Sequence, residues 1–187
     1  VAAILEELRK KIRPGVKTIE LDRLSEEMAL KKGARPAFKG YRGYPYSLCT
    51  SVNSEVVHGM PSERELKEGD IVSLDCGAIY KGYVGDSALS VGVGAISEEA
   101  QKLLNVTEEA LRVGLDQARA GNETSDISRA VQAYVEDHGY SVVREYTGHG
   151  VGRTMHEPPQ VPNWWPRGRQ RVLAWQSVRL EPGITFA

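Results

Sequence analysis

The sequence predicts an α/β fold of the α+β type, in which two helices precede several short strands, twice in succession. Residues 1–33 and 97–139 place apolar residues three and four positions apart, which is typical of helices that bury one face. Residues 38–91 consist instead of short β-rich runs separated by Gly and Pro. We therefore expect two halves, about 1–95 and 96–187, related by a pseudo-twofold axis around a central antiparallel-rich sheet.

An internal repeat is the second observation behind this expectation. Residues 13–33 and 119–139 align without gaps at an offset of 106 residues, and five positions are identical. The identical pairs are Arg13 and Arg119, Gly15 and Gly121, Thr18 and Thr124, Arg23 and Arg129, and Gly33 and Gly139. A glycine, a helix-capping residue, a helix and a terminal glycine recur in the same order, so duplication explains the match better than chance. We expect the two copies to form a single domain.

Capping and breaking residues set the helix boundaries. Helices are expected over residues 2–12, 19–33, 97–121 and 124–139. A break at Pro14-Gly15 separates the first two, and Thr18 is expected to be the N-cap of the second. His138 is expected to act as a C-terminal cap of the last.

Strands are expected at residues 46–53, 55–59, 70–80, 82–93 and 140–146. The sequence "YKGY" between the third and fourth of these fits a two-residue hairpin turn. This turn would set Tyr80 opposite Tyr83 and Gly77 opposite Asp86. The register of the hairpin therefore follows from its turn.

Composition and charge exclude several classes of protein. The 187 residues carry 24 basic and 25 acidic side chains, which gives no electrostatic reason to expect binding to nucleic acid or to an anionic membrane. No apolar run approaches the roughly 18 residues that span a bilayer, and residues 1–11 are amphipathic, unlike a signal peptide. Cys49 and Cys76 are too few for a disulfide framework. We expect a cytoplasmic protein.

Two aspartates stand beside apolar strand residues. Asp75 ends the run "IVSLD", and Asp86 follows eleven residues later. In the expected register Gly77 lies on the same face as Asp75, so the two carboxylates are diagonal neighbours, roughly 7 Å apart at the backbone. Two anions this close repel each other unless a cation lies between them, and carboxylate oxygens suit divalent metals. The alternative is a pair of solvated aspartates on an exposed hairpin.

Histidines add candidate metal ligands and proton carriers. His149 lies between Gly148 and Gly150, where another backbone segment can approach closely, and His156 follows seven residues later. His58 precedes the strand of the first aspartate. An ordinary glycine-rich loop is the alternative. A phosphate-binding loop is weakly supported, because the glycine spacing is not G-x-G-x-x-G and no P-loop lysine follows.

These segments resemble the type I methionine aminopeptidases. The segments that carry the resemblance are "GYRGYPYSLCTSVNSEVVHGMP", "GDIVSLDCGAIYKGYVGD" and "GHGVGRTMHEPPQVPN"; the likeness runs to about residue 163 and resumes at "LEPGITFA". The fold of this family is the pita-bread fold, a pseudo-twofold α/β structure, which agrees with the internal repeat. The resemblance implies a metal-dependent aminopeptidase that removes the initiator methionine from nascent proteins when the next residue is small.

The resemblance also implies roles for single residues. Asp75, Asp86 and His149 would bind two divalent metal ions (Co, Mn, Fe or Zn), whose bridging hydroxide attacks the first peptide bond. His58 and His156 would lie near that bond and stabilise the charged intermediate. A set of substrate-binding residues would contact the methionine side chain: Phe38, Tyr41, Tyr44, Cys49 and Met155. Aromatic and sulfur surfaces suit a thioether, and ordinary core packing is the alternative for each of the five.

The sequence departs from the family in two places. By the repeat, residues 69–75 correspond to 183–187 plus two further positions, which puts the first of the family's two glutamate ligands beyond Ala187. We therefore expect the C-terminal part of the domain to be missing, and Glu181 is not assigned to metal. Residues 164–180 hold all three tryptophans and are longer than the usual loop. A true insertion, a partner-binding patch and a sequence error all stay open for them.

Two rival functions use the same fold. A proline-specific peptidase is disfavoured by the segments 55–61 and 41–45 and by the short N-terminus. A catalytically inactive, metal-free binding module would use residues 164–180 as its contact surface, but such proteins typically lose the ligand residues that persist here. The expected partners are the N-termini of nascent polypeptides at the ribosome. Direct binding to nucleic acid or membrane is not expected, and we expect a monomer.

Overall fold

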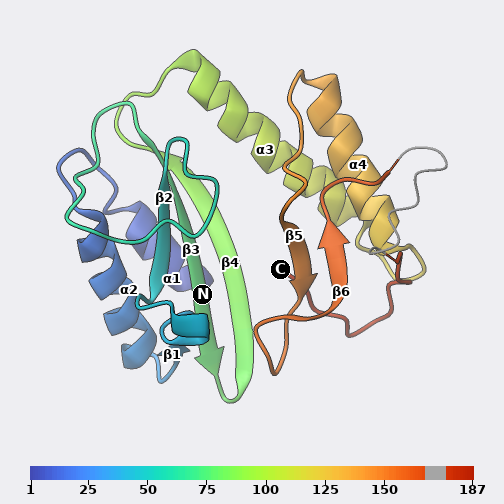
Figure 1. Ribbon diagram of the computed structural model, residues 1–187, viewed down its shortest axis with the longest axis horizontal. Helices are drawn as coiled ribbons and strands as arrows, with labels where there is room; N and C mark the ends of the chain where they lie inside the picture. Colours follow the sequence, from blue (N-terminus) through green and yellow to red (C-terminus); the bar gives the residue numbers. More distant parts are fainter. Residues whose placement is uncertain (167–175) are drawn as a thin grey trace. The chain divides into compact units, whose positions relative to one another are not determined.

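The computed structural model describes residues 1–166 and 176–187, and these form two compact units. The first unit contains residues 1–102 and 153–155, and the second contains 103–152 and 156–187. The elements, shown in Figure 1, are α1 (Ala2–Arg9), α2 (Thr18–Lys31), β1 (Arg35–Pro36), the 3₁₀ helix η1 (Tyr41–Gly43), β2 (Leu48–Val52), β3 (Ile71–Tyr80), β4 (Tyr83–Gly92), α3 (Glu98–Gln117), α4 (Thr124–Asp137), β5 (Thr147–Gly150) and β6 (Glu157–Pro162). This mixture confirms the predicted α+β class.

In the first unit, β3 is the central strand of a four-stranded antiparallel sheet (Figure 1). β4 pairs with β3 along its whole length, whereas β1 and β2 pair with successive parts of its other edge. Because side chains alternate along a strand, the sheet has one apolar and one small or polar face. The apolar face carries Leu48, Val52, Val72, Leu74 and Cys76. The polar face carries Cys49, Ser51, Ser73, Asp75 and Gly77.

Helices α1 and α2 cover the apolar face of this sheet. Their side chains in the core are at most 3% exposed: Ile4, Leu5 and Leu8 from α1, and Leu21 and Ala29 from α2. Burying each of the larger side chains contributes roughly 1.5–3 kcal/mol to stability. The helices therefore pack on the apolar face of the sheet and leave the opposite, polar face available for functional side chains.

The predicted hairpin is confirmed in detail. Tyr80 pairs with Tyr83, and Gly77 pairs with Asp86. The two turn residues between the tyrosines have positive φ angles of 50° and 83°, which match the right-handed twist of the strands.

In the second unit, β5 and β6 form a two-stranded antiparallel sheet. Helix α4 packs against β6, and α3 packs closely on α4 because it carries Gly114 at the contact. A Cβ at that glycine would lie 2.7 Å from Cγ2 of Val131. The buried core consists of Ala110, Ile127, Val131, Val161 and Leu180.

The internal repeat recurs in the hydrogen bonds at the start of each second helix. Helices α2 and α4 begin 106 residues apart, at Thr18 and Thr124, and both have 14 residues. The Thr18 amide donates to the Arg64 carbonyl at 3.0 Å, and the Thr124 amide donates to the Val178 carbonyl at 2.9 Å. The chain segments that carry these two carbonyls therefore hold equivalent places in the two units.

The strands that follow are equivalent as well. The Asn53 amide donates to the Ile71 carbonyl at 2.9 Å, and the Val151 amide donates to the Thr185 carbonyl at 3.1 Å. The end of β5 thus meets residues 184–187 as the end of β2 meets the start of β3. This is the correspondence that the sequence predicts for the two glycine-led segments.

Part of the unusual segment 164–180 is described, and the rest, 167–175, lies outside the described residues. The Trp165 amide donates to the Gln132 side chain at 2.9 Å, and the guanidinium of Arg129 lies 5.6 Å from the Trp165 ring centre. The start of the segment is therefore attached to α4 of its own unit.

The prediction that Thr18 caps its own helix is wrong, whereas the prediction for His138 is confirmed. Lys17 holds the N-cap position of α2, and its amide donates to the Glu20 carboxylate at 3.4 Å. The buried Thr18 hydroxyl instead accepts from the Ser62 amide at 2.9 Å and donates to the Ser62 carbonyl at 3.1 Å. His138 is the C-cap of α4, and its Nδ1 donates to the carbonyl of the preceding turn at 2.8 Å.

Two expected strands are loops in the structure. Residues 55–59 are irregular, and Val56 and Val57 are 58% and 40% exposed. Residues 140–146 are irregular too, and strand β5 begins only at Thr147. Both segments have the β-branched composition of strands, but neither pairs with another strand in the described part of the chain. Of the helices that the structure describes, none is long and apolar enough to cross a membrane.

Candidate metal centre and substrate-binding residues

Asp75 and Asp86 lie on the polar face of the β3–β4 hairpin. Asp75 pairs with Ala88 and Asp86 pairs with Gly77, so the two carboxylates are diagonal neighbours across the ladder. Both side chains are only partly exposed. The register inferred from the turn places them as the sequence predicts.

The surroundings of Asp75 favour its neutral form. Burial is the main cause that raises the pKa of this carboxyl to about 7, and the negative charge of Asp86 raises it further. The protonated Asp75 carboxyl donates a hydrogen bond to the Asp86 carboxylate. A proton shared by the pair removes the repulsion that a bound cation would also remove, so the pair is suited to a positive charge.

Cys49 is the ladder partner of Asp75 on β2 and shares its face of the sheet. Burial is the main reason that the pKa of this thiol is raised to about 11. The Tyr44 hydroxyl contacts the thiol and lies 3.0 Å from the Leu48 carbonyl and 3.2 Å from the Gly59 carbonyl. Cys49 is therefore a neutral, apolar surface beside the carboxylates and not an activated nucleophile.

The ring of Phe38 packs over Gly77, on the same face of β3 as Asp75. A Cβ at Gly77 would lie 2.5 Å from Cε1 of Phe38 and 3.0 Å from Cβ of Ala37. The glycine thus makes room for the ring next to the carboxylates. Apart from its place in the register, Gly77 carries a second signal in the sequence, because a glycine inside a strand often marks the close approach of another group.

Tyr41 and Met155 are the remaining members of the predicted substrate-binding set. Tyr41 begins η1, and its amide donates to the Phe38 carbonyl at 2.9 Å. Met155 is 6% exposed and lies in the short segment 153–155, which packs with the first unit. All five members of the set therefore belong to the unit that carries the two aspartates.

His58 is exposed, in the loop between β2 and β3, and has a positive φ angle of 60°. The next residue, Gly59, is held against β2: its amide donates to the Ser51 hydroxyl at 3.0 Å, and its carbonyl accepts from the Thr50 amide at 2.8 Å. A Cβ at Gly59 would collide with the Thr50 carbonyl. These contacts attach Gly59 to β2 and therefore restrict the backbone of the neighbouring residue, His58.

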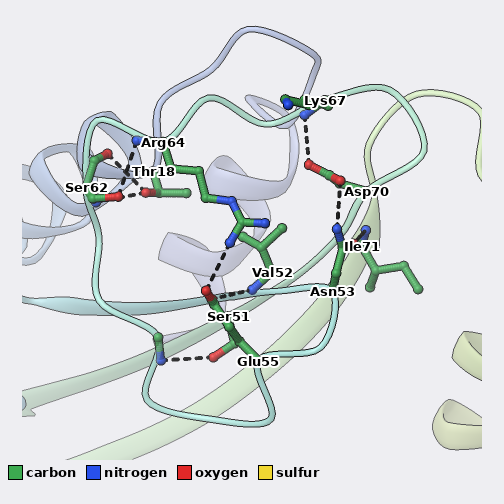
Figure 2. Close-up of polar contacts among 11 residues, drawn as sticks. Thr18, Ser51, Val52, Asn53, Glu55, Ser62, Arg64, Lys67, Asp70 and Ile71 are labelled. Carbon is green, nitrogen blue, oxygen red and sulfur yellow. Dashed lines mark hydrogen bonds and ion pairs between the residues drawn. The ribbon is translucent and has the colours of Figure 1, made fainter.

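Figure 2 shows the polar contacts that hold the rest of this loop. The Glu55 carboxylate accepts from the Val52 amide and from the Arg64 guanidinium, each at 2.9 Å. The Asn53 side chain donates to the Asp70 carboxylate at 2.8 Å, which ties the start of the loop to its end. Hydrogen bonds and an ion pair therefore hold the loop on both sides of His58.

His149 and His156 are brought together in the second unit. His149 lies in β5, His156 directly precedes β6, and their ring centres are 4.1 Å apart. Nδ1 of His149 lies 3.0 Å from the Gly150 carbonyl, and since a carbonyl only accepts, Nδ1 carries the proton. Nε2 then has the lone pair with which a neutral imidazole binds a metal.

The glycines on either side of His149 are required by close backbone approach, as predicted. A Cβ at Gly148 would lie 2.7 Å from the Ala187 carbonyl and 2.9 Å from the Val161 carbonyl. A Cβ at Gly150 would lie 2.6 Å from the carbonyl of Glu157. No side chain larger than hydrogen fits at either position.

The internal repeat gives His149 the place that Ser51 has in the first unit. His149 and Ala187 exchange both backbone hydrogen bonds at 2.8 Å, as expected for the equivalent of the Ser51–Ser73 pair. The His149 side chain therefore lies on the face that corresponds to the polar face of β3. Sequence reasoning missed this equivalence because the loops between the repeated elements differ in length.

The donors that the two units contribute are of the kind that divalent transition metals accept. The first unit contributes the pair Asp75 and Asp86, and the second contributes the pair His149 and His156. Residues 1–166 and 176–187 contain no group of three or more His, Cys, Asp or Glu side chains that could hold a metal. Aspartate oxygens and a neutral imidazole nitrogen together suit Mn, Fe, Co and Zn. The carboxylate pair and the His149 tautomer thus fit a site for a divalent transition metal.

Comparison with known proteins agrees with this chemistry. The whole chain, residues 1–187, matches the family model of metallopeptidase family M24. The chain belongs to this family. It is 54% identical over 186 residues to the methionine aminopeptidase of Clostridium acetobutylicum, and the match covers 98% of this chain and 74% of that protein.

Solved structures give the same result. The structure is similar to that of a methionine aminopeptidase from Thermotoga maritima, with a TM-score of 0.92 and 43% identity over 99% of this chain and 72% of the other. An Xaa-Pro dipeptidase from Bacillus anthracis is less similar, with a TM-score of 0.78 and 29% identity over 97% of this chain and 47% of the other. The predicted pita-bread fold, the resemblance to methionine aminopeptidases and the metal-dependent hydrolase activity are confirmed.

Proposed function

We propose that this chain carries the catalytic and substrate-binding residues of a methionyl aminopeptidase, which hydrolyses the bond after an N-terminal initiator methionine when the next residue is small. The observation that carries the proposal is the Asp75–Asp86 pair, because two partly buried carboxylates on one sheet face favour a positive charge between them. Membership of a metallopeptidase family supports a metal as that charge. The named relatives support methionine as the residue removed.

Asp75, Asp86 and His149 would hold the metal ions, two in number. When bound, such a metal polarises a carbonyl and lowers the pKa of water so that it can act as a nucleophile near neutral pH. The chain's contribution is to place two carboxylates whose shared proton a cation would replace, and to fix the imidazole. The hydrogen bond from Nδ1 of His149 to the Gly150 carbonyl holds the ring in the tautomer that binds through Nε2.

His58 and His156 are the proposed catalytic histidines. Either imidazole can donate an N–H to the carbonyl oxygen of the substrate's first residue as negative charge develops there. The Gly59 contacts with β2 restrict the His58 backbone, and the ring of His149 lies against the ring of His156. The backbone of His58 and the ring of His156 thus have restricted positions, which lowers the cost of orienting these residues for the reaction.

The substrate-binding set would contact the methionine side chain. Aromatic and sulfur surfaces gain dispersion energy with a thioether. Cys49 faces Asp75 across the ladder, and Phe38 covers Gly77. This surface adjoins the carboxylates, as is required when the recognised side chain belongs to the residue whose carbonyl group is attacked.

We propose further that residues 1–187 act as one catalytic domain. The substrates would be the N-termini of nascent polypeptides, processed in the cytoplasm by a monomer at the ribosome. Co, Mn, Fe and Zn all suit the donor set, so metal identity requires measurement.

Cleavage of the peptide Met-Ala-Ser tests this proposal. The purified protein is stripped with a chelator, reloaded with each of the four metals in turn, and assayed for free methionine, with Asp75→Asn as the control. Metal-dependent release by wild type alone supports the proposal. Cleavage restricted to Xaa-Pro peptides would identify a proline-specific peptidase instead. Absence of cleavage with every metal would favour a catalytically inactive binding module.

A further inference from the structure

Asp22 is a buried carboxylate of the first unit that has no part in the proposed chemistry. It lies in α2 and is 6% exposed. Its Oδ1 accepts the Ser47 amide at 2.7 Å and the Leu48 amide at 3.0 Å. Burial raises the pKa of Asp22, although these two hydrogen bonds act in the opposite direction. The two amides thus offset part of the cost of burying the carboxylate.

The Ser47 and Leu48 amides lie next to two members of the substrate-binding set, Tyr44 and Cys49. Ser47 and Leu48 form the corner at which the chain enters β2, and the Leu48 carbonyl lies 3.0 Å from the Tyr44 hydroxyl. Cys49 is the next residue along β2. A shift of this corner would therefore move the Tyr44 hydroxyl and the Cys49 thiol together.

The repeat indicates that the helix itself does not require this carboxylate. At the offset of 106 residues, Asp22 of α2 corresponds to Ser128 of α4. Ser128 is also buried, and its hydroxyl donates to the Thr124 carbonyl of its own helix at 3.1 Å. The carboxylate is thus a feature of the unit that carries the substrate-binding set and not of the repeated helix.

We infer that Asp22 is a positioning residue for substrate recognition, which fixes Tyr44 and Cys49 by holding the Ser47 and Leu48 amides. This inference rests on the proposed function, which assigns both positioned residues to the substrate. Without the carboxylate, two buried amides lose their acceptor and the corner gains freedom. The effect falls on substrate binding and not on the chemical step, because the carboxylate acts only through this corner of the chain.

Three variants test the inference against wild type. Asp22→Ser introduces the residue type that the second repeat carries at this position, and Asp22→Asn keeps a neutral acceptor. Ser25→Ala is the matched control, because Ser25 lies in the same helix, is 2% exposed, and donates to the Asp22 carbonyl without contacting the two amides. Each metal-loaded protein is assayed with Met-Ala-Ser and Leu-Ala-Ser, and its unfolding in urea is followed in parallel.

We expect Asp22→Ser to raise KM for Met-Ala-Ser roughly tenfold or more, to change kcat by less than about threefold, and to weaken the preference for methionine over leucine. Asp22→Asn should fall between Asp22→Ser and wild type, and Ser25→Ala should keep the wild-type KM. An unchanged KM in folded Asp22→Ser, or an equal rise in Ser25→Ala, overturns the inference.

The inference can still be tested if the Asp22→Ser variant does not fold. If Asp22→Ser does not unfold cooperatively, Asp22→Asn decides: a raised KM with wild-type kcat supports the inference, and an unchanged KM overturns it. If neither variant folds, Asp22 is a stability residue and the inference is overturned. Inactivity of wild type with every metal is a separate result, which overturns the proposed function and this inference with it.

Discussion

Asp75 lies diagonally across the β3–β4 ladder from Asp86, and its protonated carboxyl group is hydrogen-bonded to the Asp86 carboxylate. This relationship connects the fold to the proposed chemistry. A two-residue turn sets the register, the register places two acids on one face, and burial makes their joint ionisation unfavourable. A divalent cation is the partner that permits both to ionise.

Without metal, the pair should make the protein less stable as pH rises from about 4 to about 7. The pKa of Asp75 is 3.8 as its ordinary value and about 7 when folded, so in this range the folded state binds more protons than the unfolded state. The stabilising contribution is complete below pH 3.8 and is lost as pH passes 7. Relative to Asp75→Asn, wild type should lose up to about 1.4 kcal/mol per pH unit.

The free energy of unfolding of both proteins is measured with urea, in the presence of a chelator, from about pH 4 to about pH 8. Titrating groups that do not interact with Asp75 cancel in the difference between the two proteins, whereas Asp86 titrates together with Asp75 and is part of the measured effect. A difference that stays constant over the range would contradict the raised pKa.

Metal binding should raise the melting temperature of wild type and lose most of this effect in Asp86→Asn. A ligand at 100 times its dissociation constant stabilises by about 2.7 kcal/mol, and removing one of two carboxylate ligands lowers the affinity. Asp116→Asn is the control, because Asp116 is exposed on α3 and pairs with Arg119 at 3.7 Å. Equal thermal shifts in the two variants would place the metal elsewhere.

Gly77→Ala should raise KM for Met-Ala-Ser and destabilise the protein by about 1–3 kcal/mol. The added Cβ would lie 2.5 Å from the Phe38 ring, so the ring must move away from the carboxylates. Gly85→Ala is the matched control on β4, where the Cβ would meet only Cγ2 of Val1, at 3.3 Å. Kinetics and urea unfolding measure both effects. Wild-type KM in Gly77→Ala would show that Phe38 does not contact the substrate.

Substitution of the two histidines of the second unit should separate metal binding from catalysis. His149→Gln should weaken metal affinity at least about tenfold, because Nε2 of His149 is the proposed ligand atom. His156→Gln should lower kcat by about 10²-fold or more while metal affinity stays close to wild type. Calorimetric metal titration and kinetics measure the two quantities. The assignment is wrong if both variants lose metal equally.

Thr18→Val and Thr124→Val should destabilise the protein by similar amounts, about 0.5–1.5 kcal/mol each, because each removes the acceptor of a partly buried hydrogen bond. The Thr18 hydroxyl accepts from the Ser62 amide at 2.9 Å, and the Thr124 hydroxyl accepts from the Val178 amide at 3.1 Å. Urea unfolding gives both values. A large loss in one variant and none in the other would argue that the two hydrogen bonds are not equivalent.

Local rules were sufficient for the parts of the site that depend on neighbours in sequence. The turn after Tyr80 fixes its own hairpin and therefore the relationship of Asp75 to Asp86. The glycines around His149 signalled a close backbone approach, which Gly148 and Gly150 confirm. In each case the deciding residues lie within a few positions of the feature.

Features that depend on distant contacts could not be predicted in this way. An aspartate in an amphipathic helix suggests an exposed position, yet Asp22 is buried because the Ser47 amide, 25 residues away, approaches it. The run 55–59 has strand composition, but Asn53 and His58 adopt positive φ angles and the run turns away from the sheet. Tertiary contacts overrode local propensity at both places.

The metal-binding role of the Asp75–Asp86 pair in a methionine-releasing enzyme is the proposal on which the others depend. Its most direct test is the amount of free methionine that chelated and metal-reloaded protein releases from Met-Ala-Ser, measured for wild type and Asp75→Asn side by side. We expect release of methionine by reloaded wild type, none by chelated wild type, and at most a small fraction of the wild-type amount by Asp75→Asn. Equal release by Asp75→Asn, or release that persists in chelator, would contradict it.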